Sequence, residues 1–265
     1  MPTLELHVTR LGNLGDSIIF VHGGFGWGDE CWAEQRPLAS DYRLLLVDRC
    51  GHGHSPDIGR NSFEDQADDI LAVAAQVVHL VGQSYGALVC LVAVLRSPNR
   101  VRSLTVIEPP AWSLLESDPY VQALVAKEQP IFAAANELGP ERAYARFIGA
   151  SDADADRLSL SDMDRKSISA TLKQPYPLEA PVSAEALKGL DMPVLVVSGG
   201  RPRDASQERR DAGMAYRRIC DRLEDLLNAQ RAHLPFGAHN PQMVAEPFNS
   251  TLRLFLQAAG GGSVE

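Results

Sequence analysis

Short apolar runs rich in branched side chains recur along the chain, and residues typical of turns bound each of them. Five such runs are Ser17–Val21, Leu44–Asp48, Val77–Val81, Val101–Ile107 and Val194–Ser198. Each is almost continuously apolar, whereas a strand with one face in water alternates apolar and polar residues. The pattern therefore predicts buried, parallel strands.

Stretches with helical spacing of apolar residues lie between most of these runs. They are Phe63–Gln76, Ala87–Arg96, Glu208–Asn228 and Phe248–Ala258. Strands that alternate with helices build a parallel sheet covered by helices on both faces, so the fold class is α/β. An N-terminal strand over Leu4–Arg10, ahead of turn-like residues, is expected to pair antiparallel at the sheet edge.

The alternation breaks off after Pro109 and resumes near Leu190. Helical runs such as Tyr120–Ala135 and Glu141–Gly149, separated by proline and glycine, fill the interval. We interpret this interval as a helical cap inserted into the sheet domain.

Length and composition suit one domain with an insertion. The 265 residues are 45% hydrophobic and 22% charged, as in an ordinary globular protein. We expect a core domain formed by residues 1–110 and 190–259, a cap over 111–189, and a flexible, glycine-rich tail over 260–265.

The charge of the chain excludes some partners. With 34 acidic and 25 basic residues the net charge is -9, which repels a nucleic-acid backbone. No apolar stretch approaches the roughly 18 residues of a membrane span, and no signal peptide is recognisable. We expect no membrane partner and a cytoplasmic location, with reduced thiols at the scattered cysteines Cys31, Cys50, Cys90 and Cys220.

The strongest local motif is G-x-S-x-G over Gly82–Gly86, with Ser84 at its centre. An apolar strand precedes it and the apolar helical run Ala87–Leu91 follows. A sharp turn from strand to helix strains the serine backbone and needs glycine on both sides, so that neighbouring backbone can pass close by. The motif predicts Ser84 as a nucleophile at a helix N-terminus.

A second glycine-rich loop, His22–Gly26, follows the first buried strand. Such a loop can turn backbone N–H groups toward a developing oxyanion, and we expect the N–H groups of Gly24 and Tyr85 to form the oxyanion hole. Neither glycine spacing typical of nucleotide binding occurs, so nucleotide binding is not expected.

A serine hydroxyl needs a base, and seven histidines are available. His239 follows the short run His233–Pro235, which predicts the last strand, and precedes the terminal helix. Loops that leave the carboxyl edge of an α/β sheet gather ligand chemistry, which favours His239. His52 and His54 lack a third ligand at a recognisable zinc spacing, so no metal site is expected.

Together these segments resemble the α/β-hydrolase fold family. The resemblance rests on the HGG loop, Asp48–Ser55 after the next strand, the turn at Ser84 and the late histidine, and it spans Ile18 to about Leu256. It implies a mostly parallel, eight-stranded sheet, a Ser–acid–His triad in that chain order, and no cofactor. Cys50 departs from the residues more usual before Gly51, which leaves the triad untouched.

Two residues compete as the acid of the triad. Glu108 ends a strand and is followed by two prolines, and a subset of the family that resembles zearalenone lactonases carries a glutamate there. Asp204 follows the later strand, from which many family members take the acid, but its loop is long and Arg201 and Arg203 flank it. We favour Glu108 and keep Asp204 as the alternative.

The predicted activity is cleavage of a carboxylic ester or lactone through an acyl-enzyme on Ser84, with His239 as base. The substrate is expected to be small, uncharged and fairly apolar. Aromatic residues expected to line its pocket are Phe25, Trp27, Trp112, Tyr120, Phe132, Phe147 and Tyr176.

Other functions on this scaffold are alternatives to ester cleavage. Dehalogenases and epoxide hydrolases that resemble this fold use an aspartate nucleophile, which Ser84 disfavours. Carbon–carbon bond hydrolases and cofactor-free perhydrolases keep the same triad and stay open. A non-catalytic binding module is also possible on the fold, although such proteins usually lose a triad member. The chain is a possible homodimer.

Overall fold

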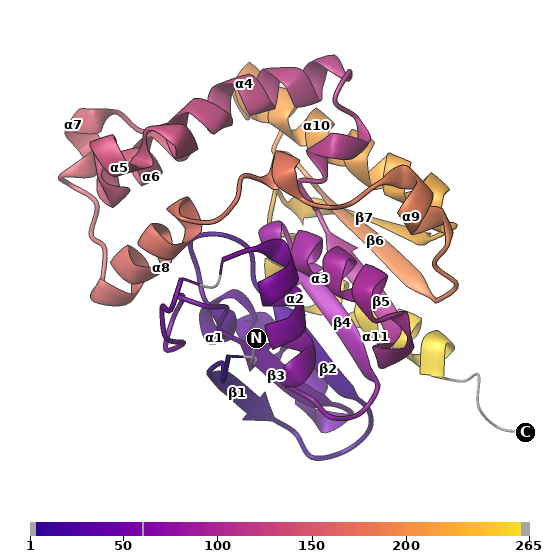
Figure 1. Cartoon of the computed structure of the whole chain (residues 1–265). Helices are drawn as coiled ribbons and strands as arrows, with labels where there is room; N and C mark the ends of the chain where they lie inside the picture. The colour runs from indigo at the N-terminus through magenta and orange to yellow at the C-terminus, as the bar shows by residue number, and fades with distance from the viewer. Residues whose placement is uncertain (1–3, 60, 261–265) are drawn as a thin grey trace, which may run out of the picture.

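A seven-stranded sheet forms the centre of the computed structural model, which describes residues 4–59 and 61–260 (Figure 1). The strand order is β1-β3-β2-β4-β5-β6-β7, with β1 antiparallel to β3 and every other neighbouring pair parallel. The strands are β1 (Val8–Leu11), β2 (Ser17–Val21), β3 (Arg43–Val47), β4 (Val78–Gln83), β5 (Val101–Ile107), β6 (Val194–Gly200) and β7 (Gln230–Gly237).

The predicted count of eight strands is wrong for the described residues. An eighth strand would need an N-terminal hairpin ahead of β2, but β1 is followed directly by a tight turn. Gly12 and Gly15 in this turn have φ values of 73° and 60°, and a Cβ atom on either would meet the carbonyl oxygen of Tyr42 or Asp41. The turn leads straight into β2, so β1 alone pairs with β3 at the edge.

Alternate residues of each central strand face opposite layers of helices. In β2, Ile19 and Val21 face the larger apolar core and Ile18 and Phe20 face the smaller one. Helices α2 (Phe63–Ala72), α3 (Tyr85–Arg96) and α10 (Gln207–Leu227) pack in the larger core, and α11 (Glu246–Gly260) packs in the smaller one. Both faces are therefore buried, as the continuous apolar runs predict.

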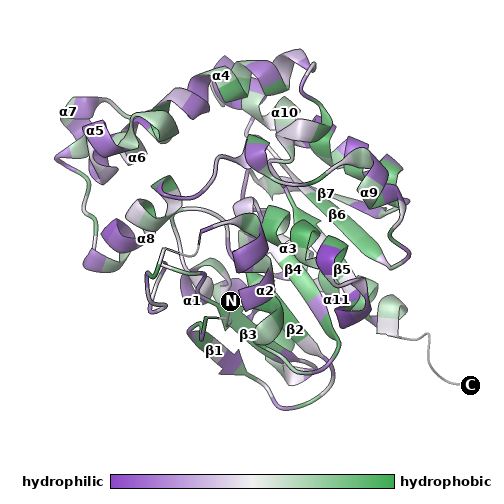
Figure 2. Cartoon of the chain, viewed as in Figure 1, coloured by the Kyte–Doolittle hydropathy of each residue, from purple (hydrophilic) through white to green (hydrophobic). Residues whose placement is uncertain are grey.

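The segment between β5 and β6 is helical, and its helices before α9 (Ala184–Lys188) lie over one end of the sheet (Figure 1). These helices are α4 (Pro119–Ala133), α5 (Ala135–Leu138), α6 (Pro140–Phe147), α7 (Asp152–Ala155) and α8 (Asp162–Leu172). Hydrophobic residues dominate the central strands and α3, whereas α5 to α8 mix hydrophobic and hydrophilic residues (Figure 2). The division into core and cap domains stays a prediction.

Two further expectations concern the chain ends and the membrane. Gly260, assigned to the flexible tail, is the last residue of α11, and the rest of that tail lies outside the described residues. Among the described helices, none combines the length and the apolar character needed to cross a membrane.

Candidate active site

Ser84 occupies the turn between β4 and α3, with φ 50° and ψ -123°. This positive φ is unusual for a residue with a side chain. The glycines on either side leave room for neighbouring backbone: a Cβ atom on Gly82 would lie 2.6 Å from the Gly86 carbonyl oxygen, and one on Gly86 would lie 2.3 Å from that of Val21. The turn therefore holds the Ser84 hydroxyl at the N-terminus of α3, where the helix dipole favours negative charge.

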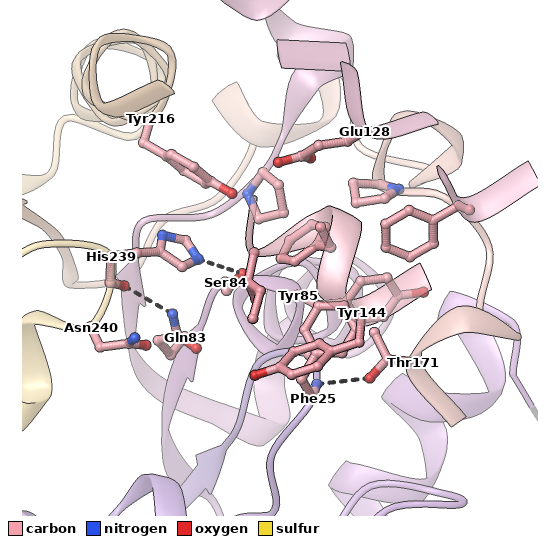
Figure 3. A pocket seen from close by; sticks show the side chains of 16 residues that line it. Phe25, Gln83, Ser84, Tyr85, Glu128, Tyr144, Thr171, Tyr216, His239 and Asn240 are labelled. Carbon is pink, nitrogen blue, oxygen red and sulfur yellow. Dashed lines mark hydrogen bonds between the residues drawn. The ribbon is translucent and has the colours of Figure 1, made fainter. Parts of the chain in front are cut away.

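A hydrogen-bonded chain joins Ser84, His239 and Glu108. His239 Nε2 lies 2.9 Å from Ser84 Oγ, and His239 Nδ1 lies 3.0 Å from Glu108 Oε2. The three residues follow β4, β5 and β7, whose carboxyl ends point the same way because the strands are parallel. Figure 3 shows His239 and Ser84 meeting at the cavity. Asp204, the alternative acid, is exposed in the loop after β6.

Glu108 is 1% exposed and is surrounded by donors. Its Oε1 accepts from the backbone N–H of Gly199 (2.9 Å), and its Oε2 accepts from Arg201 Nη2 (2.7 Å). Burial by itself raises the pKa of Glu108, but hydrogen bonds and charges from His239 and Arg201 outweigh it, and the pKa lies below its ordinary value. Glu108 is therefore a carboxylate at neutral pH, ready to orient His239.

Two further side chains support His239. Gln83 Nε2 donates to the His239 carbonyl oxygen (3.0 Å), and the Tyr216 ring packs on the imidazole with 4.4 Å between centroids. The sequence alone assigned no role in the site to these residues, and it placed Arg201 beside Asp204 instead of Glu108. Gln83 lies inside the G-x-S-x-G motif, and Arg201 follows β6, the neighbour of the strand that ends at Glu108. Arg201 can be placed next to Glu108 only when the order of the strands in the sheet is known, and the sequence alone does not give this order.

Gly24 and Tyr85 both line the cavity beside Ser84, and neither backbone N–H has a hydrogen-bond partner among the described residues. Arg49, fully buried, donates to the carbonyl oxygens of His22 (3.0 Å) and Gly23 (2.6 Å). The C=O and N–H of one trans peptide group point in opposite directions. Holding the Gly23 oxygen on Arg49 therefore turns the Gly24 N–H away from the core.

A cavity of about 250 Å³ opens above Ser84. Phe25, Phe132 and Phe147 line it as expected from the sequence. Its further lining residues are Gln83, Pro110, Glu128, Tyr144, Ile148, Thr171, Pro177, Tyr216, His239 and Asn240. Most of this wall is apolar or aromatic, which suits an apolar part of a small molecule.

Four of the aromatic residues expected at the pocket do not line it. They are Trp27, Trp112, Tyr120 and Tyr176. Trp112 is fully buried and packs on Tyr216, 4.9 Å between ring centroids, so it belongs to the core behind the wall. Trp27 instead precedes helix α1 (Gly28–Cys31). Helical spacing does not distinguish a core aromatic from a lining one, which is why these assignments were wrong.

The described residues hold no cluster of three or more metal-ligating side chains. His52, weighed above as a ligand, is buried, and its Nε2 lies 3.0 Å from Thr171 Oγ1. Burial, together with the charge of Arg49, lowers the pKa of His52 well below its ordinary value. The imidazole is therefore neutral and contributes to packing between α8 and the loop after β3.

Comparison with known proteins decides the family. The sequence profile described as alpha/beta hydrolase fold matches residues 16–245. The chain belongs to the α/β-hydrolase fold family. The family predicted from the sequence is thus confirmed, with seven strands in place of eight.

The individual proteins that resemble this chain share little sequence identity with it. A pimeloyl-(acyl-carrier protein) methyl ester esterase of Aliivibrio fischeri strain MJ11 is 25% identical over 91% of this chain and 94% of that protein. A thermophilic esterase from Thermogutta terrifontis superposes with a TM-score of 0.66 and 19% identity, over 97% of this chain and 94% of that one. An epoxide hydrolase from Bacillus megaterium gives 0.69 and 17%, over 96% and 97%. At such identities the structural likeness concerns the fold alone.

Proposed function

We propose that the chain is a serine hydrolase that cleaves a carboxylic ester or lactone through an acyl-enzyme on Ser84. The observation that carries the proposal is the hydrogen-bonded chain from Ser84 through His239 to the buried Glu108, which opens into a cavity. A serine, a base and an orienting carboxylate in this geometry are the requirements for acyl transfer. The methyl ester esterases among the relatives support ester chemistry.

The mechanism follows from the geometry. Ser84 Oγ attacks the carbonyl carbon and its proton passes to His239 Nε2, while Glu108 stabilises the imidazolium through Nδ1. The oxyanion accepts hydrogen bonds from the N–H groups of Gly24 and Tyr85. His239 then protonates the leaving alcohol, and a water molecule that it deprotonates releases the acid from Ser84.

The cavity supports a small substrate with an apolar portion. Phe25, Phe132 and Phe147 form its wall, and the ring of Phe25 packs on that of Phe147 with 4.7 Å between centroids. The volume of about 250 Å³ lies just below the range of roughly 300–1,000 Å³ for drug-sized ligands. A short acyl chain or a small lactone therefore fits better than a long-chain lipid.

The test uses short p-nitrophenyl esters, methyl esters and lactones with wild type, Ser84→Ala, Glu108→Gln and Asp204→Asn, each checked for folding. We expect Ser84→Ala to lose about 10⁴-fold or more in kcat, and Glu108→Gln to lose about 10³–10⁴-fold because the histidine is no longer oriented. Asp204→Asn is the matched control, since Asp204 is exposed, and should retain activity.

Two results would overturn the proposal. One is a folded wild type that hydrolyses none of the panel and does not react with a fluorophosphonate probe, which would favour a binding module. The other is activity that survives Ser84→Ala. If Asp204→Asn lost its activity while Glu108→Gln kept full activity, Asp204 would be the acid of the triad in place of Glu108. The proposal of a serine hydrolase would then still stand.

A further inference from the structure

Glu128 places a carboxyl group in the wall of a largely apolar cavity. It lies on α4, and Figure 3 shows its carboxyl pointing toward the part of the cavity that the Tyr216 hydroxyl also reaches. Its neighbours in the wall from the helical segment include Phe132 and Phe147. A carboxyl group loses hydration in such surroundings, and this loss destabilises the fold unless a partner compensates for it.

No cation among the described residues is paired with Glu128. Its neighbour in the chain, Lys127, points to α10 instead and forms an ion pair with Glu208 (2.5 Å). Burial raises the pKa of Glu128 to about 7, although the charge of Lys127 and the nearby Tyr176 hydroxyl both oppose this shift. The fold therefore gives this carboxyl group no charged partner among the described residues, and the neighbouring donor there is the Tyr176 hydroxyl.

Two further polar groups beside Glu128 are unsatisfied. The Tyr176 hydroxyl and the Trp112 indole N–H are buried and have no hydrogen bond of ordinary geometry among the described residues. Burial raises the pKa of Tyr176, and the nearby Glu128 carboxylate adds to this shift, which indicates that the two groups are close. Three polar groups thus lie together behind or in one wall of the cavity, next to the aromatic ring of Phe132, which packs on Tyr176 with 5.4 Å between centroids.

We propose that Glu128 is the acceptor of a polar subsite, which binds an O–H or N–H donor that the substrate carries away from its scissile carbonyl. The inference rests on ester hydrolysis at Ser84. A hydroxyl and an ammonium group both donate to a carboxylate, and either would compensate a carboxyl group that has no cation beside it. A substrate that is apolar at this end would bury Glu128 without a partner.

The test compares methyl esters from butanoate to octanoate that end in a methyl, hydroxyl or amine group. We expect wild type to prefer the best hydroxyl or amine ester over its alkyl analogue by about tenfold or more in kcat/KM, since a site built for a donor rejects ligands that lack it. Glu128→Leu should lose this preference while still cleaving alkyl esters. Glu128→Gln should keep it for a hydroxyl donor and lose it for an ammonium donor.

Glu137→Leu is the matched control, because Glu137 is an exposed glutamate of α5 with no ion pair among the described residues. An unchanged preference in Glu128→Leu would overturn the subsite and leave the proposed hydrolysis standing. A melting temperature of Glu128→Leu far below that of Glu137→Leu would also overturn it, by assigning Glu128 a structural role.

If wild type cleaves no ester, the proposed function is wrong, and the polar subsite is then tested by measuring ligand binding. Calorimetry with hexanol and hexylamine on wild type and Glu128→Leu is then the measurement. Weaker binding of either compound to the variant supports the subsite, and equal binding overturns it.

Discussion

Ser84 and Glu108 both have a backbone conformation that residues with side chains rarely adopt. The φ values are 50° at Ser84 and 45° at Glu108. Such strain persists only where the surroundings fix the backbone, and here Ser84 N donates to Ile107 O while Glu108 N donates to Val197 O. The strain at Ser84 can be predicted from the sequence, because the flanking glycines indicate a sharp turn there. No residue near Glu108 in the sequence indicates that its backbone is strained. The sequence therefore leaves both Glu108 and Asp204 as candidates for the acid of the triad.

Arg201 shows why the acid could not be chosen from sequence alone. The sequence places Arg201 three residues before Asp204, which indicates a solvated ionic cluster. In the structure the Arg201 side chain is 14% exposed and turns to Glu108. That contact depends on β5 and β6 being neighbours, which is a property of the assembled sheet and not of either segment.

We predict that Arg201→Gln destabilises the fold in a pH-dependent way. The lowered pKa of Glu108 means that its ionised form stabilises the folded state above the ordinary value of 4.5, and that this contribution is lost as pH falls through the lowered value. The variant should lose about 2 kcal/mol of unfolding free energy at neutral pH. Urea titrations at neutral and acidic pH measure this, and the gap between variant and wild type should narrow below 4.5.

Arg203→Gln is the control, since Arg203 is exposed in the same loop. It should change the unfolding free energy by less than about 0.5 kcal/mol at any pH. A gap for Arg201→Gln that stays constant on acidification would mean that its pairing with Glu108 does not stabilise the fold.

At the scale of elements, the buried strands were the most predictable part. The run Val101–Ile107 coincides with β5, and Ser17–Val21 coincides with β2, because a strand buried on both faces must be apolar throughout. The last strand was predicted from His233–Pro235 alone, whereas β7 begins at Gln230. Polar residues such as Arg231 are tolerated at a sheet edge, so the apolar pattern reveals only part of β7.

The elbow between β4 and α3 gives a prediction at this scale. A Cβ atom on Gly86 would lie 2.3 Å from Val21 O and 2.4 Å from His22 O, which are backbone atoms that cannot rotate away. Gly86→Ala should therefore separate α3 from the end of β2 and destabilise the protein by about 3 kcal/mol or more. Thermal unfolding measures the loss.

Gly189→Ala serves as its control. The closest contact of a Cβ atom there is Ala186 O at 3.5 Å, an ordinary van der Waals distance. If both alanine variants melt within a degree or two of wild type, the elbow is more tolerant than this packing implies.

At the scale of the whole molecule, α8 connects the helical segment to two loops of the sheet. Thr171 Oγ1 accepts from the backbone N–H of Phe25 (2.8 Å), beside the cavity. Lys166 Nζ donates to the carbonyl oxygens of Gly53 (2.7 Å) and Ser55 (2.8 Å) in the loop after β3. The position of Thr171 in the cavity wall is therefore linked to Lys166, a residue of the same helix that does not line the cavity.

This linkage predicts that Lys166→Met loosens α8 without disturbing the sheet. Methionine keeps most of the side-chain length but cannot donate, so the local opening free energy should fall by about 1 kcal/mol and amide exchange in α8 should rise about fivefold. Exchange in α3 and β4 should not change, and KM should rise more than kcat falls, because the wall moves but the hydrogen-bonded chain at Ser84 does not.

Lys173→Met separates this effect from simple loss of charge. Lys173 also joins the end of α8 to the same loop, through an exposed ion pair with Asp57 (3.1 Å). Exposed pairs contribute about 0–1 kcal/mol, so this variant should exchange almost as slowly as wild type. Hydrogen exchange followed by mass spectrometry compares the two. Equal acceleration in both variants would mean that net charge, and not the pair of backbone contacts made by Lys166, holds α8 against the loop after β3.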